Sequence, residues 1–261
     1  MNMKTGMKFL AAGAVVAACI SSCGLFQGGE VRFREYESHV EESPAAGGQN
    51  KVTIDIVLSV PEKGTCRQAI DAITGDIIRE ALGEDYAGMD VQEAIDGFTA
   101  DIVGNYNETA VEFAEEFSKE GDEWSGTFEW TYDIKGRKEG EYRNWISYTV
   151  DTYSYLGGAH GGSVCRGLNF DRKSGKLLSE DDIFVYGYEE TLNNALRSHL
   201  KSSLEEDRYG MLFDTDITPN GNFVLSSYGI TYIYGQYEIG PYTAGIIKVS
   251  VPWDEIQSIL R

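Results

Sequence analysis

Hydrophobic and polar residues alternate along several stretches of this chain, a pattern typical of β-strands with one buried face. The alternation is clearest in residues 52–58, where every second residue is aliphatic, and Pro61 is expected to end this strand. The same reasoning predicts strands over residues 31–40, 128–134, 142–155, 164–170, 223–226, 230–234 and 247–251. The glycines and basic residues of segment 136–140 predict a hairpin turn between two of them.

Apolar residues recur with helical spacing in two stretches that follow the strand at 52–58. The first covers residues 70–81 and should stop at Gly83, since glycine is common just after a helix. The second opens after Asp90, a good N-cap residue. Gly97 and Gly104 lie inside it and predict a kink or a break.

Later elements complete an order of strands, helices, strands, helix, strands and helix. A short helical turn is expected near Glu180, a third long helix over 189–206, and a closing helix after Pro252. Because the strands cluster instead of alternating strictly with helices, the fold class is α+β, with antiparallel sheets and about four helices. We expect two parts, an N-terminal half over 31–160 and a C-terminal half over 161–261.

The stretch Tyr153-Ser-Tyr-Leu-Gly-Gly-Ala-His-Gly-Gly162 joins two predicted strands and holds one of only three histidines. Glycine at this density indicates backbone with positive φ or a close approach to another group. The stretch is therefore either an unusual connection or a site. His160 has no evident nucleophile or metal ligand beside it, so a role in shaping the connection is favoured.

Tyrosines flank this stretch and crowd a later segment. Tyrosine offers stiff contact area with a polar tip and is enriched where proteins bind other proteins or sugars. Tyrosines also fill sheet faces, which is the alternative. The candidate ligand-binding residues are Tyr153, Tyr155, Gly157, Gly158, His160, Tyr232, Tyr234 and Tyr237.

The first residues form an export signal. Lys4 and Lys8 precede an apolar run, residues 9–20, that is shorter than the ~20 residues of a membrane span. The run leads into Ile20-Ser-Ser-Cys23, which resembles a lipobox and implies that Cys23 is lipidated after residues 1–22 are removed. An ordinary secretory signal is the alternative. With residues 23–30 as a tether and no aspartate after Cys23, we expect an outer-membrane lipoprotein that faces the periplasm or the cell surface.

The net charge of the chain limits the classes of partner that it can bind. It is −20 overall, and removal of residues 1–22 takes away two lysines and no acid, which leaves −22. Nucleic acid is excluded, because phosphate binding depends on Lys and Arg. A basic protein fits this charge, although solubility alone would also explain it. Cys66 and Cys165 remain in the folded part, and after export they could form a disulfide or stay as two small buried residues.

No catalytic signature stands out in the sequence. There is no Gly-x-Ser-x-Gly, no His-Glu-x-x-His, no phosphate-binding loop and no Cys-x-x-Cys. We therefore expect no catalytic residues, no metal and no cofactor. The alternatives are a hydrolase acting on peptidoglycan through His160 and nearby acids, or a Cys165/His160 nucleophile pair.

Several motifs together resemble one bacterial family. Ser154-Tyr-Leu-Gly-Gly-Ala-His-Gly161 is similar to its hallmark Thr-Gly-Gly-Ala-His-Gly, with Leu156 in place of the threonine. Residues 168–184, 223–245 and 251–256 carry the later motifs in the same order. The family consists of envelope domains of unknown function, found as the lysozyme-binding part of RsiV-type anti-sigma factors and beside the catalytic domain of PdaC-type peptidoglycan deacetylases.

The resemblance covers nearly all of the chain after residue 30 and implies a two-part α+β fold with a role in the cell envelope. The resulting hypothesis is a lipid-anchored, non-catalytic protein that binds lysozyme or another peptidoglycan hydrolase. A glycan-binding accessory protein is the alternative, besides the hydrolase.

Overall fold

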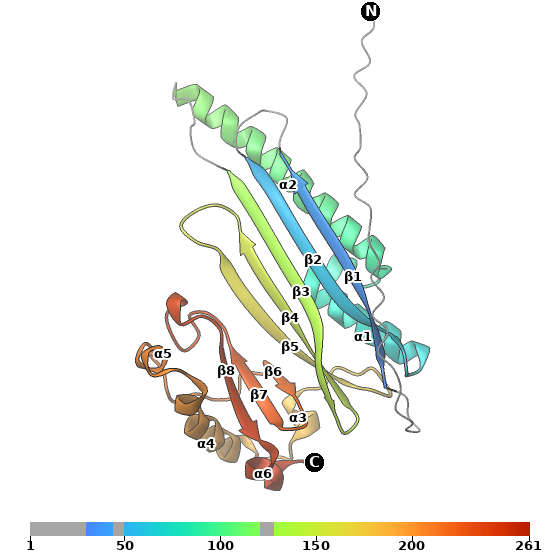
Figure 1. Cartoon of the computed structure of the whole chain (residues 1–261), viewed down its shortest axis with the longest axis vertical. Coiled ribbons are helices and arrows are strands. Elements are labelled where there is room, and N and C mark those ends of the chain that lie inside the picture. The colour runs from blue at the N-terminus through green and yellow to red at the C-terminus, as the bar shows by residue number, and fades with distance from the viewer. Residues whose placement is uncertain (1–29, 44–49, 121–127) are drawn as a thin grey trace, which may run out of the picture.

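Two β-sheets with helices packed against them form this protein, described here from a computed structural model (Figure 1). The structure describes residues 30–43, 50–120 and 128–261. The predicted signal sequence, Cys23 and residues 24–29 of the predicted tether lie outside the described residues.

The larger sheet has five strands that lie side by side in chain order. They are β1 (Arg32–Glu42), β2 (Lys51–Lys63), β3 (Glu129–Tyr142), β4 (Trp145–Tyr155) and β5 (Gly162–Asp171). Neighbours are antiparallel except β2 and β3, which are parallel. A parallel pair needs a crossover connection. Helices α1 (Arg67–Leu82) and α2 (Val91–Glu120), joined through the 3-10 helix η1 (Glu84–Tyr86), provide it.

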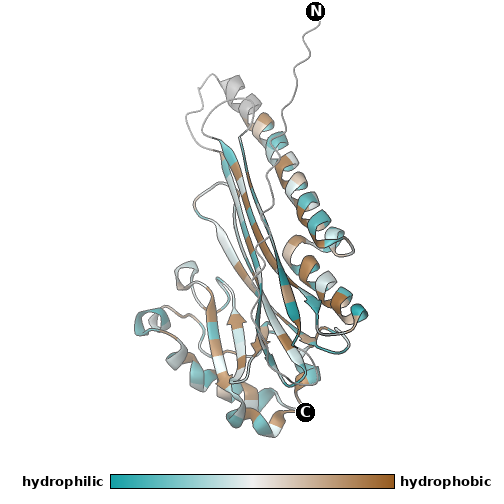
Figure 2. Ribbon diagram, turned by 45° about the vertical axis from the view of Figure 1, so that its right-hand side comes forward, coloured by the Kyte–Doolittle hydropathy of each residue, from teal (hydrophilic) through white to brown (hydrophobic). Residues whose placement is uncertain are grey.

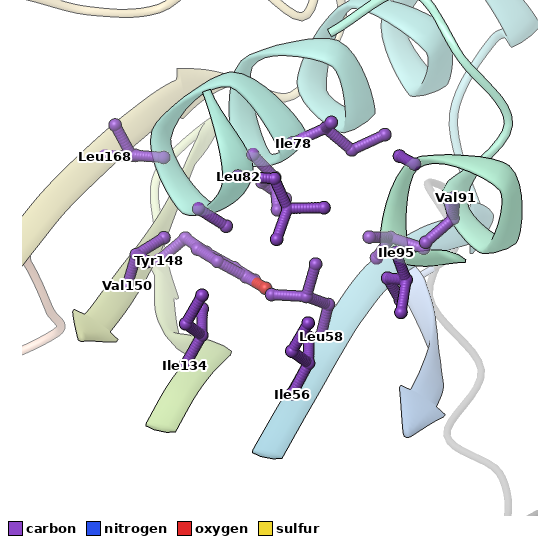
Figure 3. Packing of buried hydrophobic residues seen from close by; sticks show 14 of the residues in the cluster. Ile56, Leu58, Ile78, Leu82, Val91, Ile95, Ile134, Tyr148, Val150 and Leu168 are labelled. Carbon is purple, nitrogen blue, oxygen red and sulfur yellow. The ribbon is translucent and has the colours of Figure 1, made fainter. Parts of the chain in front are cut away.

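These two helices cover one face of the larger sheet and enclose the first core (Figures 1 and 3). Ile56 and Leu58 of β2 are fully buried there, opposite Ile78 and Leu82 of α1 and Ile95 of α2. Hydrophobic and hydrophilic residues are interspersed along both helices and strands (Figure 2). Every second residue of a strand and every third or fourth residue of a helix lies on the same face, so each element can bury one face. Each such side chain contributes about 1.5–3 kcal/mol relative to exposure.

The second part contains a smaller antiparallel sheet, in the order β6 (Phe223–Leu225), β7 (Gly229–Tyr234) and β8 (Ile247–Pro252). Its helices are α3 (Glu180–Ile183), α4 (Glu189–Leu200), α5 (Glu206–Gly210) and α6 (Trp253–Ile256). Three 3-10 helices complete it, η2 (Lys201–Ser203), η3 (Tyr242–Ala244) and η4 (Gln257–Ile259). Residues between Ile183 and Ile259 form a second core of their own. The α+β class with two mostly antiparallel sheets is thus confirmed.

Side-chain amides join the two sheets where β6 crosses β5. The Asn222 amide accepts a hydrogen bond from the Gly167 N–H (2.8 Å) and donates one to the Cys165 carbonyl (2.9 Å). The Asn169 amide donates to the Phe223 carbonyl at 2.7 Å. A Cβ at Gly167 would lie 2.2 Å from that carbonyl oxygen, so glycine is required for the approach. We call these contacts the seam.

The division between the two parts differs from the predicted boundary at residues 160 and 161. That boundary falls at the end of the hairpin formed by β4 and β5, and β5 belongs to the larger sheet. The first core extends to Phe170, and the second begins at Ile183. The division therefore lies between those two residues, where the chain leaves β5 and turns into α3.

The predicted turn at residues 136–140 is also wrong, because β3 continues through it to Tyr142. The chain turns at Arg143 instead, which has a φ of 54°. Residue 136 of this strand is a glycine because a Cβ there would lie 2.3 Å from the Tyr148 hydroxyl on β4. Glycine inside a strand often marks such an approach.

Three other boundaries differ from expectation. Helix α2 runs without a break from Val91 through Gly97 and Gly104 to Glu120. Strand β2 continues past Pro61 to Lys63, and the helix expected over 189–206 ends at Leu200, followed by η2. Within the described residues, no helix is both long enough and apolar enough to cross a membrane.

Candidate ligand-binding site

The glycine-rich stretch forms the loop of the hairpin between β4 and β5. Its first glycines, Gly157 and Gly158, have φ values of 90° and 95°, which disfavour any residue with a side chain. The Tyr155 hydroxyl donates a hydrogen bond back to the Gly158 carbonyl at 2.9 Å. The two glycines therefore let the chain reverse tightly, and Tyr155 holds the reversed loop in place.

The second half of the loop contacts the C-terminal part of the chain. The His160 ring stacks on Tyr242, with ring centres 4.2 Å apart and planes inclined by 28°. The Tyr242 hydroxyl donates to the Gly161 carbonyl at 2.9 Å, and the Ser163 N–H donates to the Gln236 side chain at 2.9 Å. His160 is thus held in an inter-element contact, as its predicted shaping role requires.

Close packing explains why residue 161 is a glycine. Gly161 is buried, and a Cβ at this position would lie 2.4 Å from the Tyr153 hydroxyl oxygen. The Tyr153 ring covers the loop from the preceding strand while keeping 38% of its surface exposed. Of the predicted residues, Tyr153, Tyr155, Gly157, Gly158 and His160 therefore form one local structure.

Exposed apolar side chains gather where the hairpin loop contacts the C-terminal loop. Tyr237 is 59% exposed, and its ring centre lies 6.0 Å from that of Tyr242. Phe213 is 63% exposed, and its N–H donates to the Ile239 carbonyl at 3.2 Å, next to this loop. Leu156, in the hairpin loop, is 49% exposed. We call this surface the aromatic end; its members are Leu156, His160, Phe213, Tyr237 and Tyr242.

Tyr237 has an unusual backbone conformation. Its φ is 66°, a value that bulky residues adopt rarely and that costs of order 1–3 kcal/mol. Glu238 supports it by accepting hydrogen bonds from the Gly235 N–H and the Asn220 amide, both at 2.7 Å. Such strain persists only where the surroundings enforce it, and here it keeps an aromatic ring at the surface.

Two of the predicted binding tyrosines are buried instead. The Tyr232 hydroxyl donates to the Glu180 carboxylate at 2.8 Å, and the Tyr234 hydroxyl donates to the Thr218 carbonyl at 2.9 Å. Burial raises the pKa of both hydroxyl groups well above its ordinary value, and the Glu180 carboxylate adds to this at Tyr232. These two tyrosines belong to the second core and cannot contact a ligand at the surface.

The candidate disulfide between Cys66 and Cys165 is absent from the structure, where both cysteines are free. Cys66 is exposed just before α1, with its Sγ 3.5 Å from the Lys173 carbonyl oxygen. Cys165 is buried in β5, where burial and a hydrogen bond with Asp151 raise the pKa of its thiol to about 12. A thiol that holds its proton so firmly is a poor nucleophile, which argues against the Cys165/His160 pair.

His160 also lacks the partners that catalysis would need. Its Nδ1 lies 3.2 Å from the Gly161 carbonyl oxygen, and its ring contacts Tyr242. Within residues 30–43, 50–120 and 128–261, no carboxylate is hydrogen-bonded to it and no group of three or more acidic, histidine or cysteine residues could hold a metal ion. The geometry gives His160 a structural contact and no general-base partner.

Exposed acidic residues lie next to members of the aromatic end in the sequence. Asp214 and Asp216 follow Phe213 in sequence and Glu238 follows Tyr237, and all three are exposed. Asp216 pairs with Arg197 at 2.7 Å. Among the ion pairs of the described residues, none involves Asp214 or Glu238. The surface thus combines apolar side chains with unpaired negative charge at its edge.

Sequence reasoning missed Phe213 and Gln236 at this surface. Phe213 is a single aromatic residue followed by polar ones, which gives no periodic signal. Gln236 contacts Ser163 across 73 positions of sequence, and only the folded chain brings them together. Tyr242 belongs to the same crowd of C-terminal tyrosines, yet its role depends on the equally distant His160.

Fold and site together define a two-sheet α+β protein with an exposed aromatic surface where its two parts meet. Residues 181–254, within the second part, match a family described as a protein of unknown function (DUF3298). A crystal structure of a DUF3298 family member from Bacteroides fragilis is 26% identical, with a TM-score of 0.75 over 88% of this chain and 94% of that one.

A crystal structure of a DUF3298 family protein from Pseudomonas aeruginosa shares the fold, with 17% identity and a TM-score of 0.55 over 90% of this chain and 96% of that one. No curated protein matches the chain. The expected likeness to a domain of unknown function is confirmed for residues 181–254 and for the fold.

Proposed function

We propose that this chain is a lipid-anchored protein of the cell envelope that binds a basic protein through its aromatic end and has no catalytic activity of its own. The aromatic end is the observation that carries this proposal. Large apolar side chains rimmed by polar residues are typical of protein-binding surfaces. Tyr237 and Phe213 expose 59% and 63% of their surfaces there.

The surface is also held rigidly, which favours tight binding. The hydrogen bonds of Gly161 and Ser163 with the C-terminal part fix the hairpin loop, and the Glu238 carboxylate fixes the loop that carries Tyr237. A surface ordered before binding loses less conformational entropy when a partner docks. A few buried aromatic residues at the centre of an interface commonly supply most of its binding energy.

The charge of the chain selects the class of partner. A net charge of −20, with Asp214 and Glu238 unpaired beside the aromatic end, attracts a basic protein and speeds its association. Lysozyme is the candidate that the family resemblance suggests, and another peptidoglycan hydrolase is the nearest substitute. Cys23 would hold the protein at the outer membrane through its lipid.

Isothermal titration calorimetry with lysozyme tests this proposal. Binding should be measurable at low ionic strength and should weaken steeply with salt, because the Debye length falls from about 10 Å at 0.1 M to about 3 Å at 1 M. Tyr237→Asn should weaken it further, since asparagine tolerates the positive φ without supplying a ring. Tyr186→Asn is the matched control, because Tyr186 is fully exposed and lies outside the aromatic end. No heat of binding at low salt would refute the lysozyme proposal.

A further inference from the structure

A cleft of about 570 Å³ lies away from the aromatic end, between the start of β1 and the first turns of α1 and α2. Arg34 and Tyr36 of the edge strand form one wall, and Arg67 of α1 and the turn carrying Gly88 and Met89 face them. Its size falls within the range of about 300–1,000 Å³ that is usual for small-molecule sites.

The two arginines of the cleft differ in their partners. Arg67 is paired with Asp71 at 2.8 Å. The Arg34 guanidinium lies 4.9 Å from the centre of the Tyr36 ring, and no carboxylate in the described parts of the chain pairs with it.

None of the acidic residues that line the cleft forms an ion pair with Arg34 in the described part of the chain. Asp71 is occupied by Arg67, and Asp90 caps α2 by accepting the Gln92 N–H at 2.9 Å. Glu62, on the neighbouring strand β2, is exposed and forms no ion pair or hydrogen bond with Arg34 in the described part of the chain. Arg34 therefore keeps its planar face on Tyr36 and its N–H donors free for an incoming anion.

Part of the rest of the cleft is apolar. Val60 and Val91 line it and are almost fully buried, while Met89 is 45% exposed. Methionine is flexible and adapts to irregular apolar ligands. A Cβ built at Gly88 meets no atom within 4 Å, so this side of the cleft has room.

We propose that this cleft binds a small ligand that carries one carboxylate and an apolar body, about the size of a capped amino acid or dipeptide. Arg34 would bind the carboxylate through two parallel hydrogen bonds, the geometry that a guanidinium offers and an ammonium does not. The apolar body would lie against Val60, Val91 and Met89. The site is separate from the aromatic end and does not depend on the function proposed above.

The test compares N-acetyl-L-phenylalanine with its amide, which lacks the carboxylate, by NMR titration of the full-length protein. The acid should shift the amide signals of Gly88 and Met89 saturably, and the amide should bind at least about tenfold more weakly, because a charge-assisted hydrogen bond contributes at least that factor. Arg34→Gln should cause the same loss. Arg32→Gln is the control, since Arg32 is an exposed arginine of the same strand that does not line the cleft.

Three results would overturn the proposal: equal affinity for acid and amide, unchanged affinity in Arg34→Gln, or no saturable shift at the cleft. Because Arg34 is exposed, the variant should melt at the same temperature as the wild type, which separates lost binding from lost folding. Gly88→Leu gives a second test, as it fills open space and should block the acid without strain.

Discussion

Replacing Asn222 by alanine would remove two of the three hydrogen bonds of the seam that joins the two sheets. Asn222 is 8% exposed and makes two hydrogen bonds across the junction, with the Gly167 N–H and the Cys165 carbonyl, and a third, to the Ile233 carbonyl, within the second part. The Ile233 carbonyl keeps a second donor, the Asn220 amide, at 2.9 Å. The substitution therefore leaves two backbone groups of β5 without a partner.

The expected loss follows from those two groups. A buried polar group left without a hydrogen bond costs about 1–3 kcal/mol, so the two groups together should lower the free energy of unfolding of Asn222→Ala by about 2–6 kcal/mol. That is a large share of the roughly 5–15 kcal/mol that stabilises a typical protein. The Gly167 amide, now without its acceptor, should also lose protection from hydrogen exchange.

Urea unfolding followed by tryptophan fluorescence and by circular dichroism measures this loss. Asn105→Ala is the matched control, because Asn105 is exposed on α2 and alanine favours a helix. Asn222→Asp would keep the acceptor for Gly167 but place a carboxylate against two carbonyl oxygens, so it should also destabilise. If Asn222→Ala unfolds at the same urea concentration as Asn105→Ala, the seam does not hold the two parts together.

Three further predictions follow from individual contacts. Gly136→Ala should destabilise by about 1–3 kcal/mol, because its Cβ would meet the Tyr148 hydroxyl; Tyr148→Phe in the same chain should recover part of the loss in a urea titration. Alkylation of the native protein followed by mass spectrometry should modify Cys66 and spare Cys165 until urea is added; a disulfide-linked peptide would contradict the free thiols. Burial, and then the nearby acid Glu129, raise the pKa of the Tyr106 hydroxyl from 10.0 to about 12 in the folded protein. The contribution of the protonated hydroxyl to the stability of the fold is therefore complete below pH 10 and is lost as the pH rises through 12. The free energy of unfolding should fall over that range, and less steeply in Tyr106→Phe.

Local patterns predicted most of the elements, and distant contacts explain the failures. The alternation of hydrophobic and polar residues predicted β2 correctly, because buried and partly exposed side chains alternate along this strand. Gly136 was misread as part of a turn, since its reason is the Tyr148 hydroxyl on the neighbouring strand. The division between the two parts was misplaced because the pairing of β4 with β5 leaves no mark on the sequence beyond an ordinary hairpin.

The sequence predicted the hairpin residues of the candidate site but not its contacts with the C-terminal part. The hairpin residues could be found because glycine density reports on backbone conformation directly, as the φ of 90° at Gly157 shows. Tyr232 and Tyr234 could not be assigned, because a tyrosine in a strand has the same local pattern whether its ring meets solvent or a buried carboxylate such as Glu180. The stacking of His160 on Tyr242 required the fold itself.

Hydrogen–deuterium exchange with and without lysozyme at low ionic strength tests the central proposal most directly. If the aromatic end binds a basic protein, lysozyme should slow exchange in residues 156–163, 211–214 and 235–245 and leave the exposed loop at Tyr186 unchanged. The protection should vanish at high salt. Protection confined to other surfaces, or none at all, would contradict the account.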